Sequence, residues 1–191
     1  LSGAPRKLFD RENSRRHREF RGAWVSGARA EYIVIDVVQG TSMIGAHFKP
    51  GGAAAFLGMP ADELADRVES TDSIWGGGMN DLRAAILEES SISGKFQLLE
   101  EFLRGRLTAP DGCDAIGHAL HRLTDSPDVG RMAQVANELG MSQKHFIALF
   151  RARVGLTPKK FCRVRRFHKA LGEIESKRAL DWSAIAANTG Y

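Results

Sequence analysis

A helix, a tight glycine turn and a second helix are predicted within residues 132–166, and this pattern constrains the chain more than any other. With Met132 as position one, Ala136 is at position five, where only a small residue lets two helices touch. Gly140 is at position nine, where the turn favours a positive φ. Ser142 is predicted to cap the second helix. The positions expected to be buried hold Val135, Leu139, Met141, Phe146 and Leu149. Together these matches indicate a helix-turn-helix that reads DNA, and an ordinary helical hairpin in an enzyme is the alternative.

A third, basic helix is predicted to follow directly. Gly155 suits the left-handed end of a helix, Thr157 suits an N-cap, and Pro158 suits a first turn because its missing N–H costs no hydrogen bond there. The helix is predicted over residues 158–176, where ~19 residues would span roughly 28 Å. Basic residues flank its apolar stripe: Lys159, Lys160, Arg163, Arg165, Arg166 and Lys169.

The end of the chain repeats the first pattern. With Gly190 at position nine, Ala186 takes position five and Trp182 position one, so residues 181–191 predict the first half of a second helix-turn-helix. One long helix separates the two turns, which suits two reading helices in successive major grooves about 34 Å apart. The second reading helix does not follow Tyr191, and we expect either that the chain is a fragment or that this helix is disordered.

The charge distribution agrees with a DNA-binding C-terminal half. Residues 127–191 hold 12 Lys or Arg and 5 Asp or Glu, whereas residues 1–126 hold 15 and 18. A positive excess beside a helix-turn-helix is expected where protein meets phosphates.

The N-terminal half predicts an α+β fold. Strands are expected over residues 23–26, 32–38 and 42–48, and the arginine-rich residues 11–22 are expected to form a solvated hairpin or loop rather than a nucleic-acid arm. Helices are expected over residues 53–59, 61–68, 82–89, 95–107 and 114–124. Residues 108–112 are the best linker. The prediction is thus a small β-rich N-terminal domain with following helices over 1–109, and an all-α double helix-turn-helix domain over 113–191, the second motif being incomplete.

Side chains that could support other chemistry are sparse. Cys113 and Cys162 lack metal-ligand spacing and are expected to be reduced thiols of a cytoplasmic protein. His118 and His121 lie three apart without a completing ligand, so we expect no metal site and no cofactor. Cys162 lies near basic residues, yet no base or oxyanion donor accompanies it, and we expect no enzyme. No apolar run is long enough to span a membrane.

The chain resembles the AraC/XylS family of bacterial transcription regulators. The resemblance rests on Gly155-Leu156-Thr157-Pro158 with Phe161, on the Ile185-Ala186 and Gly190-Tyr191 pairs, and on the long helix between two helix-turn-helices, and it covers about residues 114–191. It implies a homodimer that binds double-stranded DNA, acts on RNA polymerase, and senses a small-molecule effector through an N-terminal domain, often a cupin-like barrel. No cupin metal signature is visible here.

The resemblance also assigns residue roles. The third, sixth and seventh residues of the reading helix, Lys144, Ile147 and Ala148, would meet base edges, helped by Gln143. An arginine is common in the family at the position of Ala148, so this chain departs from the pattern there. The residues expected at phosphates are Ser142, Arg151, Lys159, Lys160, Arg163 and Arg166. The alternative is an enzyme or protein-interaction module fused to a helix-turn-helix that no longer reads DNA.

Overall fold

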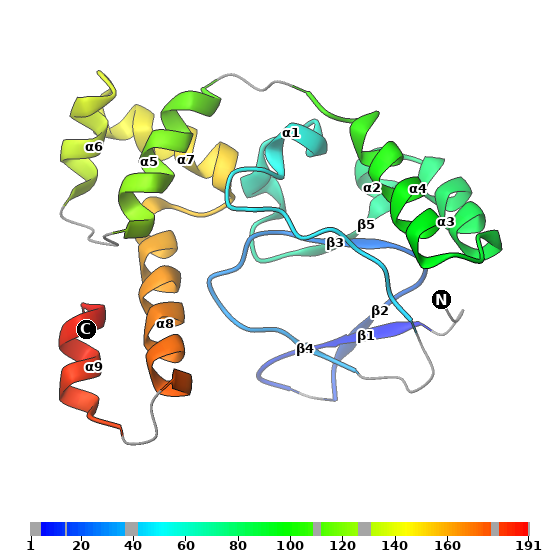
Figure 1. Ribbon diagram of the computed structural model, residues 1–191, viewed down its shortest axis with the longest axis horizontal. Helices are drawn as coiled ribbons and strands as arrows, with labels where there is room; N and C mark the ends of the chain where they lie inside the picture. Colours follow the sequence, from blue (N-terminus) through cyan, green and yellow to red (C-terminus); the bar gives the residue numbers. More distant parts are fainter. Residues whose placement is uncertain are drawn as a thin grey trace.

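The computed structural model describes residues 5–13, 15–36, 42–108, 112–125, 131–176 and 180–190. Within them, two small antiparallel sheets and several helices form an N-terminal part, and helices alone form the C-terminal part (Figure 1). The α+β class predicted from the sequence is therefore confirmed.

The described strands form two separate sheets. One sheet has the order β2-β1-β4, and the other pairs β3 with β5. The strands of the first sheet are β1 (Arg6–Phe9), β2 (His17–Phe20) and β4 (Val34–Ile35), and those of the second are β3 (Trp24–Ser26) and β5 (Val68–Ser70). The arginine-rich residues 11–22, predicted as a hairpin or loop, contain β2, which forms a hairpin with β1: Arg6 lies opposite Phe20 and Phe9 opposite His17. A cupin-like barrel stays a prediction.

Short helices connect and cover these sheets. They are α1 (Ala54–Leu57), the 3₁₀-helix η1 (Ala61–Leu64), α2 (Thr71–Trp75), α3 (Gly78–Glu88) and α4 (Ile92–Arg104). Helices α3 and α4 pack together over a cluster around Met79, Leu82 and Ile86.

Two predictions for the N-terminal part were wrong. Residues 42–48 were predicted as a strand, but they are irregular and pair with no strand among the described residues. Residues 61–68 were predicted as one helix, but η1 ends at Leu64. Asp66 then takes a left-handed φ of 58°, which stops a helix, and Val68 pairs with Ser26 in the β3–β5 sheet.

The C-terminal part follows the predicted order of helices. These are α5 (Cys113–Asp125), α6 (Met132–Glu138), α7 (Gln143–Val154), α8 (Pro158–Ser176) and α9 (Trp182–Thr189). The bounds of α8 agree with the prediction because Thr157 caps its first turn, where the Oγ1 of Thr157 accepts from the Lys160 N–H at 3.2 Å.

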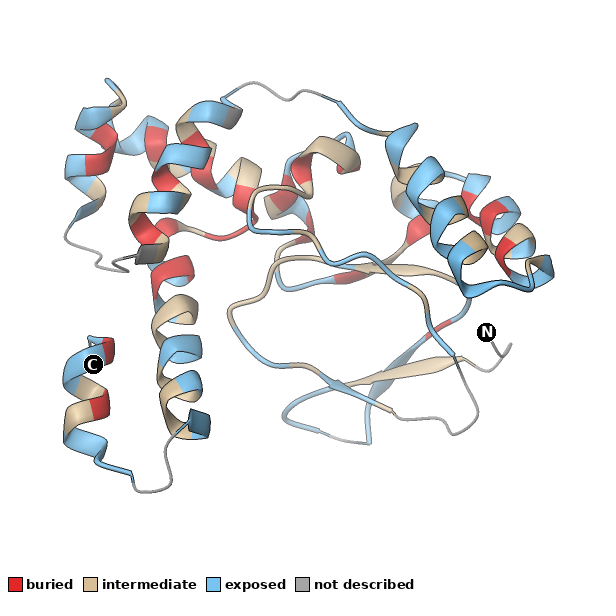
Figure 2. Cartoon of the chain, in the orientation of Figure 1, coloured by how far each residue is buried: buried red, intermediate tan, exposed pale blue. Residues whose placement is uncertain are grey.

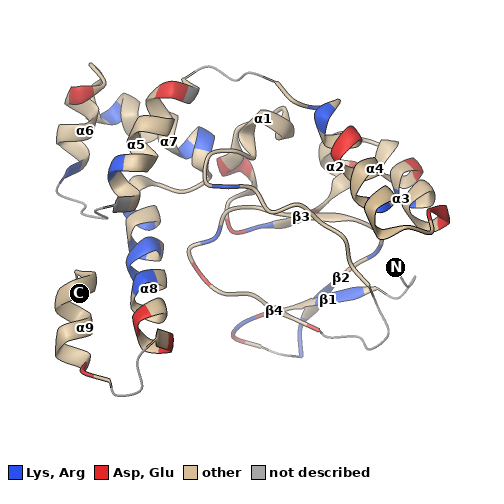
Figure 3. Cartoon of the chain, in the orientation of Figure 1, with Lys and Arg blue, Asp and Glu red and all other residues tan. Residues whose placement is uncertain are grey.

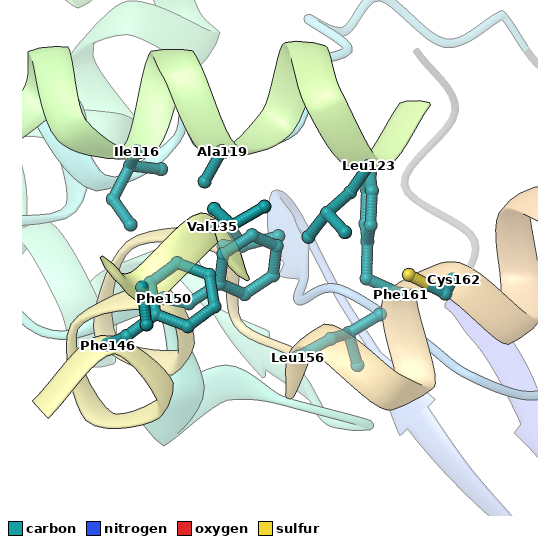
Figure 4. Packing of buried hydrophobic residues seen from close by; sticks show 11 residues of the cluster. Ile116, Ala119, Leu123, Val135, Phe146, Phe150, Leu156, Phe161 and Cys162 are labelled. Atoms are coloured by element: carbon teal, nitrogen blue, oxygen red, sulfur yellow. The ribbon is translucent and has the colours of Figure 1, made fainter. Parts of the chain in front are cut away.

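One apolar core holds α5 to α8 together (Figures 2 and 4). Phe146 and Phe150 of α7 are fully buried, and the ring of Phe150 meets the ring of Phe161 edge-on with centroids 5.6 Å apart. The remaining buried members are Ile116, Ala119, Leu123, Val135, Ala136, Val154, Leu156 and Cys162. This core fixes α7 rigidly beside the start of α8.

The N-terminal part packs directly against this helical unit. Ala28 and Ala30 pack on the C-terminal core. Two glycines mark close approaches. A Cβ on Gly155 would lie 2.9 Å from the Ala28 Cβ, and a Cβ on Gly51 would lie 2.9 Å from Leu120 Cδ1. The two parts therefore approach each other closely at these two glycines.

Candidate nucleic-acid interface

The turn between α6 and α7 has the geometry of a helix-turn-helix. Gly140 adopts a φ of 66°, and the Met141 N–H donates to the Ala136 carbonyl at 2.9 Å. Ala136 is almost fully buried where the helices meet. Ser142 is the N-cap of α7, and its Oγ accepts from the His145 N–H at 3.2 Å. The predicted roles of these residues in the turn therefore agree with their positions in the structure.

The face of α7 opposite the core is available to a partner. Gln143, Lys144 and Ala148 are exposed, whereas Ile147 is half-buried and also packs against the core. Arg151 follows one turn after Ala148, and its side chain is 52% exposed. Spacings of three and four residues put Lys144, Ala148 and Arg151 along one side of the helix. The predicted base-reading residues thus share a surface, although Ile147 is its least exposed member.

The first turns of α8 carry several basic residues (Figure 3). Lys159, Lys160 and Arg163 are all exposed. Within the described residues, the side chains of Lys159 and Arg163 form no ion pair or hydrogen bond. These two cations are therefore accessible to an external anion.

The other predicted phosphate residues contact groups of the protein itself. Arg166 Nη1 donates to the Gly190 carbonyl at 2.8 Å, and the nearby Lys169 Nζ donates to the Asn188 carbonyl at 2.8 Å. Both side chains thus cap the C-terminal end of α9, where cations are favoured. A phosphate role for Arg166 stays a prediction, and it would compete with this cap.

Arg151 and Lys160 are paired with carboxylates of the N-terminal part. Arg151 Nη2 lies 3.0 Å from Asp62 Oδ2 on η1, and Lys160 Nζ lies 3.3 Å from Asp66 Oδ2. Burial raises the pKa of Asp66, but the N–H of Ala30 and the ammonium of Lys160 outweigh it, so the pKa of Asp66 lies below its usual value. Asp66 is therefore anionic at neutral pH.

A second feature of interest is a cavity of about 410 Å³ in the N-terminal part. It lies between β3, residues 42–48 and α2 to α4. Its walls are mainly apolar, with Trp24, Trp75, Leu82 and Ile86 among them. Arg6, Arg83 and His47 supply basic groups, and the described lining includes no carboxylate.

Two comparisons with known families bear on these sites. Residues 131–162 match the bacterial regulatory helix-turn-helix proteins of the AraC family. This segment is an AraC-type helix-turn-helix. The matched residues begin at the start of α6 and end in the first turns of α8, which is a shorter range than the resemblance drawn over residues 114–191. An AraC-type helix-turn-helix indicates DNA-binding transcription regulation.

The N-terminal part has a separate match. Residues 3–70 match a domain of unknown function, DUF6597. The chain matches no curated protein and no solved structure. The AraC-type helix-turn-helix therefore indicates DNA-binding transcription regulation for its own segment, and the role of the N-terminal part has to be argued from its own residues.

Sequence reasoning missed the two aspartates at this interface. Asp62 and Arg151 are 89 residues apart, and Asp66 and Lys160 are 94 apart, so no local pattern connects them.

In the part of the chain that the structure describes, no group of three metal-ligating side chains gathers, and His118 instead contacts Glu138 at 3.1 Å. No helix among the described residues has the length and apolar character needed to cross a membrane.

Proposed function

We propose that this protein is a sequence-specific regulator of transcription that inserts α7 into the major groove of double-stranded DNA. The observation that carries the proposal is the exposed side of α7, because a helix-turn-helix reads bases with the second helix. Lys144 and Gln143 have donors that suit guanine and adenine edges, and the methyl group of Ala148 suits a thymine methyl. Ile147, half-buried, would contribute an apolar contact at the edge of this surface.

Phosphate contacts would fix the position of α7 on the duplex. The exposed cations Lys159 and Arg163 at the start of α8 are the first candidates, since their side chains have no partner within the described residues. The backbone and Oγ of Ser142 at the start of α7, where the helix dipole favours an anion, are a further candidate. Arg151 and Lys160 join this set once their carboxylate partners are released.

A binding series at increasing salt concentration tests the proposal. The affinity of the protein for its own upstream DNA should fall linearly with salt on logarithmic axes, and Arg163→Ala should reduce the slope by about 0.9. Arg21→Ala, which removes an exposed arginine between β2 and β3, is the matched control and should leave the slope unchanged. Lys144→Ala should relax sequence preference rather than change the slope. The proposal fails if the protein shows no preference for any sequence.

We further propose that the N-terminal part senses a small effector in its cavity. The apolar walls with basic groups and no described carboxylate favour an apolar molecule with an acidic group. The dye 1-anilinonaphthalene-8-sulfonate has this chemistry, and Trp24 and Trp75 in the wall would report its binding through their fluorescence. Leu82→Phe, which narrows the cavity without adding a tryptophan, should weaken the signal, whereas an unchanged signal would exclude this site.

We also propose that the whole protein is a cytoplasmic homodimer that acts on RNA polymerase. Residues 1–109 would be the sensing and dimerising domain, and residues 113–191 the DNA-binding domain. Sedimentation of the protein with and without its DNA would test the dimer.

A further inference from the structure

Two cations beside the reading surface are already bound by carboxylates from the other part of the chain. Asp62 of η1 accepts a hydrogen bond from the Arg151 guanidinium at 3.0 Å, and Asp66 accepts one from the Lys160 ammonium at 3.3 Å. Arg151 lies on the same side of α7 as Lys144 and Ala148. The N-terminal part thus places negative charge where the proposed function places phosphate oxygens.

The local backbone holds both carboxylates in position. Asp62 lies in the first turn of η1, which packs against α7. Asp66 is held more firmly. Its Oδ1 accepts from the Ala30 N–H at 3.1 Å, its backbone carbonyl accepts from Arg29 at 3.2 Å, and its φ is 58°. The Oδ2 of Asp66 is therefore left to face Lys160.

We infer that Asp62 and Asp66 stand in for DNA phosphates and that duplex DNA competes with them for Arg151 and Lys160. This inference rests on the proposed function, because it requires those cations to meet phosphates in the DNA complex. A carboxylate and a phosphate both accept charge-assisted hydrogen bonds from guanidinium and ammonium groups, so one cation cannot fully satisfy both. The N-terminal part accordingly lowers the DNA affinity of the helix-turn-helix until these contacts open.

The competition is weak enough to be reversible. The side chains of Arg151 and Lys160 are 52% and 48% exposed, and ion pairs of this kind contribute modestly to stability because water screens them. Losing both pairs should raise the affinity for DNA by about 2- to 30-fold. Lys159 and Arg163 remain accessible throughout, so the closed arrangement weakens DNA binding without abolishing it.

The test measures binding of the full chain to a fluorescent duplex of mixed sequence at low salt, because phosphate contacts do not depend on sequence. Asp62→Asn, Asp66→Asn and the double variant remove charge and keep the shape of each side chain. Asparagine also tolerates the left-handed backbone at residue 66. Glu63→Gln is the matched control, since it removes one charge from η1 at an exposed residue that forms no ion pair among the described residues.

We expect the double variant to bind 2- to 30-fold more tightly than the unmodified chain, and Glu63→Gln to bind equally well. The gain from Asp62→Asn should disappear when Arg151→Gln is also present, because no cation is then released. Equal gains from Asp62→Asn and Glu63→Gln, or a gain that survives Arg151→Gln, would overturn the inference and indicate general charge repulsion.

The same experiment separates this inference from the proposed function. If Arg163→Ala weakens binding and the aspartate variants have no effect, the DNA-binding role stands and the competition does not. If no variant of either set changes binding to the duplex, both are refuted. Circular dichroism of each variant verifies that the helices are retained.

Discussion

Gly155→Ala should both destabilise the protein and strengthen its binding to DNA. Gly155 ends α7 with a φ of 85°, and a Cβ there would lie 2.9 Å from the Ala28 Cβ and 3.2 Å from the Ala61 carbonyl oxygen. Neither neighbour is the end of a flexible side chain. The alanine therefore fits only if the N-terminal part moves away from α7, which also separates the aspartates from their cations.

Gly140→Ala supplies the matched control. Gly140 has a similar left-handed φ of 66°, but a Cβ there would meet nothing within 4 Å. Both substitutions strain the backbone at a positive φ. Alanine also lowers the conformational entropy of the unfolded chain, which offsets part of this strain and leaves a net cost of about 1 kcal/mol. Overpacking should add about 1–3 kcal/mol at residue 155 alone, for a total of about 2–4 kcal/mol.

Urea denaturation measures the free energy of unfolding for both variants, and fluorescence anisotropy measures binding to the mixed-sequence duplex. Gly155→Ala should lose more stability than Gly140→Ala and yet bind DNA more tightly than the unmodified chain. Equal stability losses would show that the close approach of Ala28 is unimportant. A larger loss at residue 155 together with weaker DNA binding would show that the contact supports the reading helix rather than restrains it.

Three further predictions concern the helical unit and its caps. Phe150→Ala should destabilise the protein by about 3–5 kcal/mol in urea denaturation, because this residue is fully buried, whereas Phe96→Ala, at a residue that is 54% exposed, should have a much smaller effect. Thr157→Ala should lower the melting temperature through a loss of about 1 kcal/mol, since it removes the N-cap of α8, and no change would contradict the cap. The hydrogen bond from His118 holds the pKa of Glu138 below its usual 4.5, so the stability from this contact is present above pH 4.5 and is lost as the pH falls through the lowered pKa. An NMR titration of the Glu138 carboxyl carbon should show a midpoint below 4.5, and a midpoint at or above that value would refute the contact.

Local signals predicted the helical unit well. The start of α8 followed from Thr157 and Pro158, and the left-handed turns at Gly140 and Gly190 followed from the nine-position pattern. Each of these signals lies within a few residues of the structure that it specifies. Phe150, one of the two fully buried rings of α7, was missed because the pattern was applied only as far as Leu149.

The N-terminal part was predicted less well because its structure depends on distant pairings. Val68 becomes a strand residue by pairing with Ser26, which outweighs the helical composition of residues 61–68. The sequence predicted which residues lie on the exposed side of α7. It did not predict that Arg151 pairs with Asp62, because these two residues are 89 positions apart.

Arg151 and Lys160 pair with aspartates, and the phosphate contacts proposed for the same two residues predict an asymmetry in how related sequences diverge. A neutral residue at position 62 or 66 would remove only the competitor and leave a protein that binds DNA more readily. Loss of Arg151 or Lys160 would remove an aspartate pair and a proposed phosphate contact together. It would therefore weaken both the free protein's contact between its two parts and the DNA complex. Under selection, positions 62 and 66 should therefore vary while Arg151 and Lys160 persist. Related proteins should differ in how strongly the N-terminal part lowers the affinity for DNA, and keep the same basic residues.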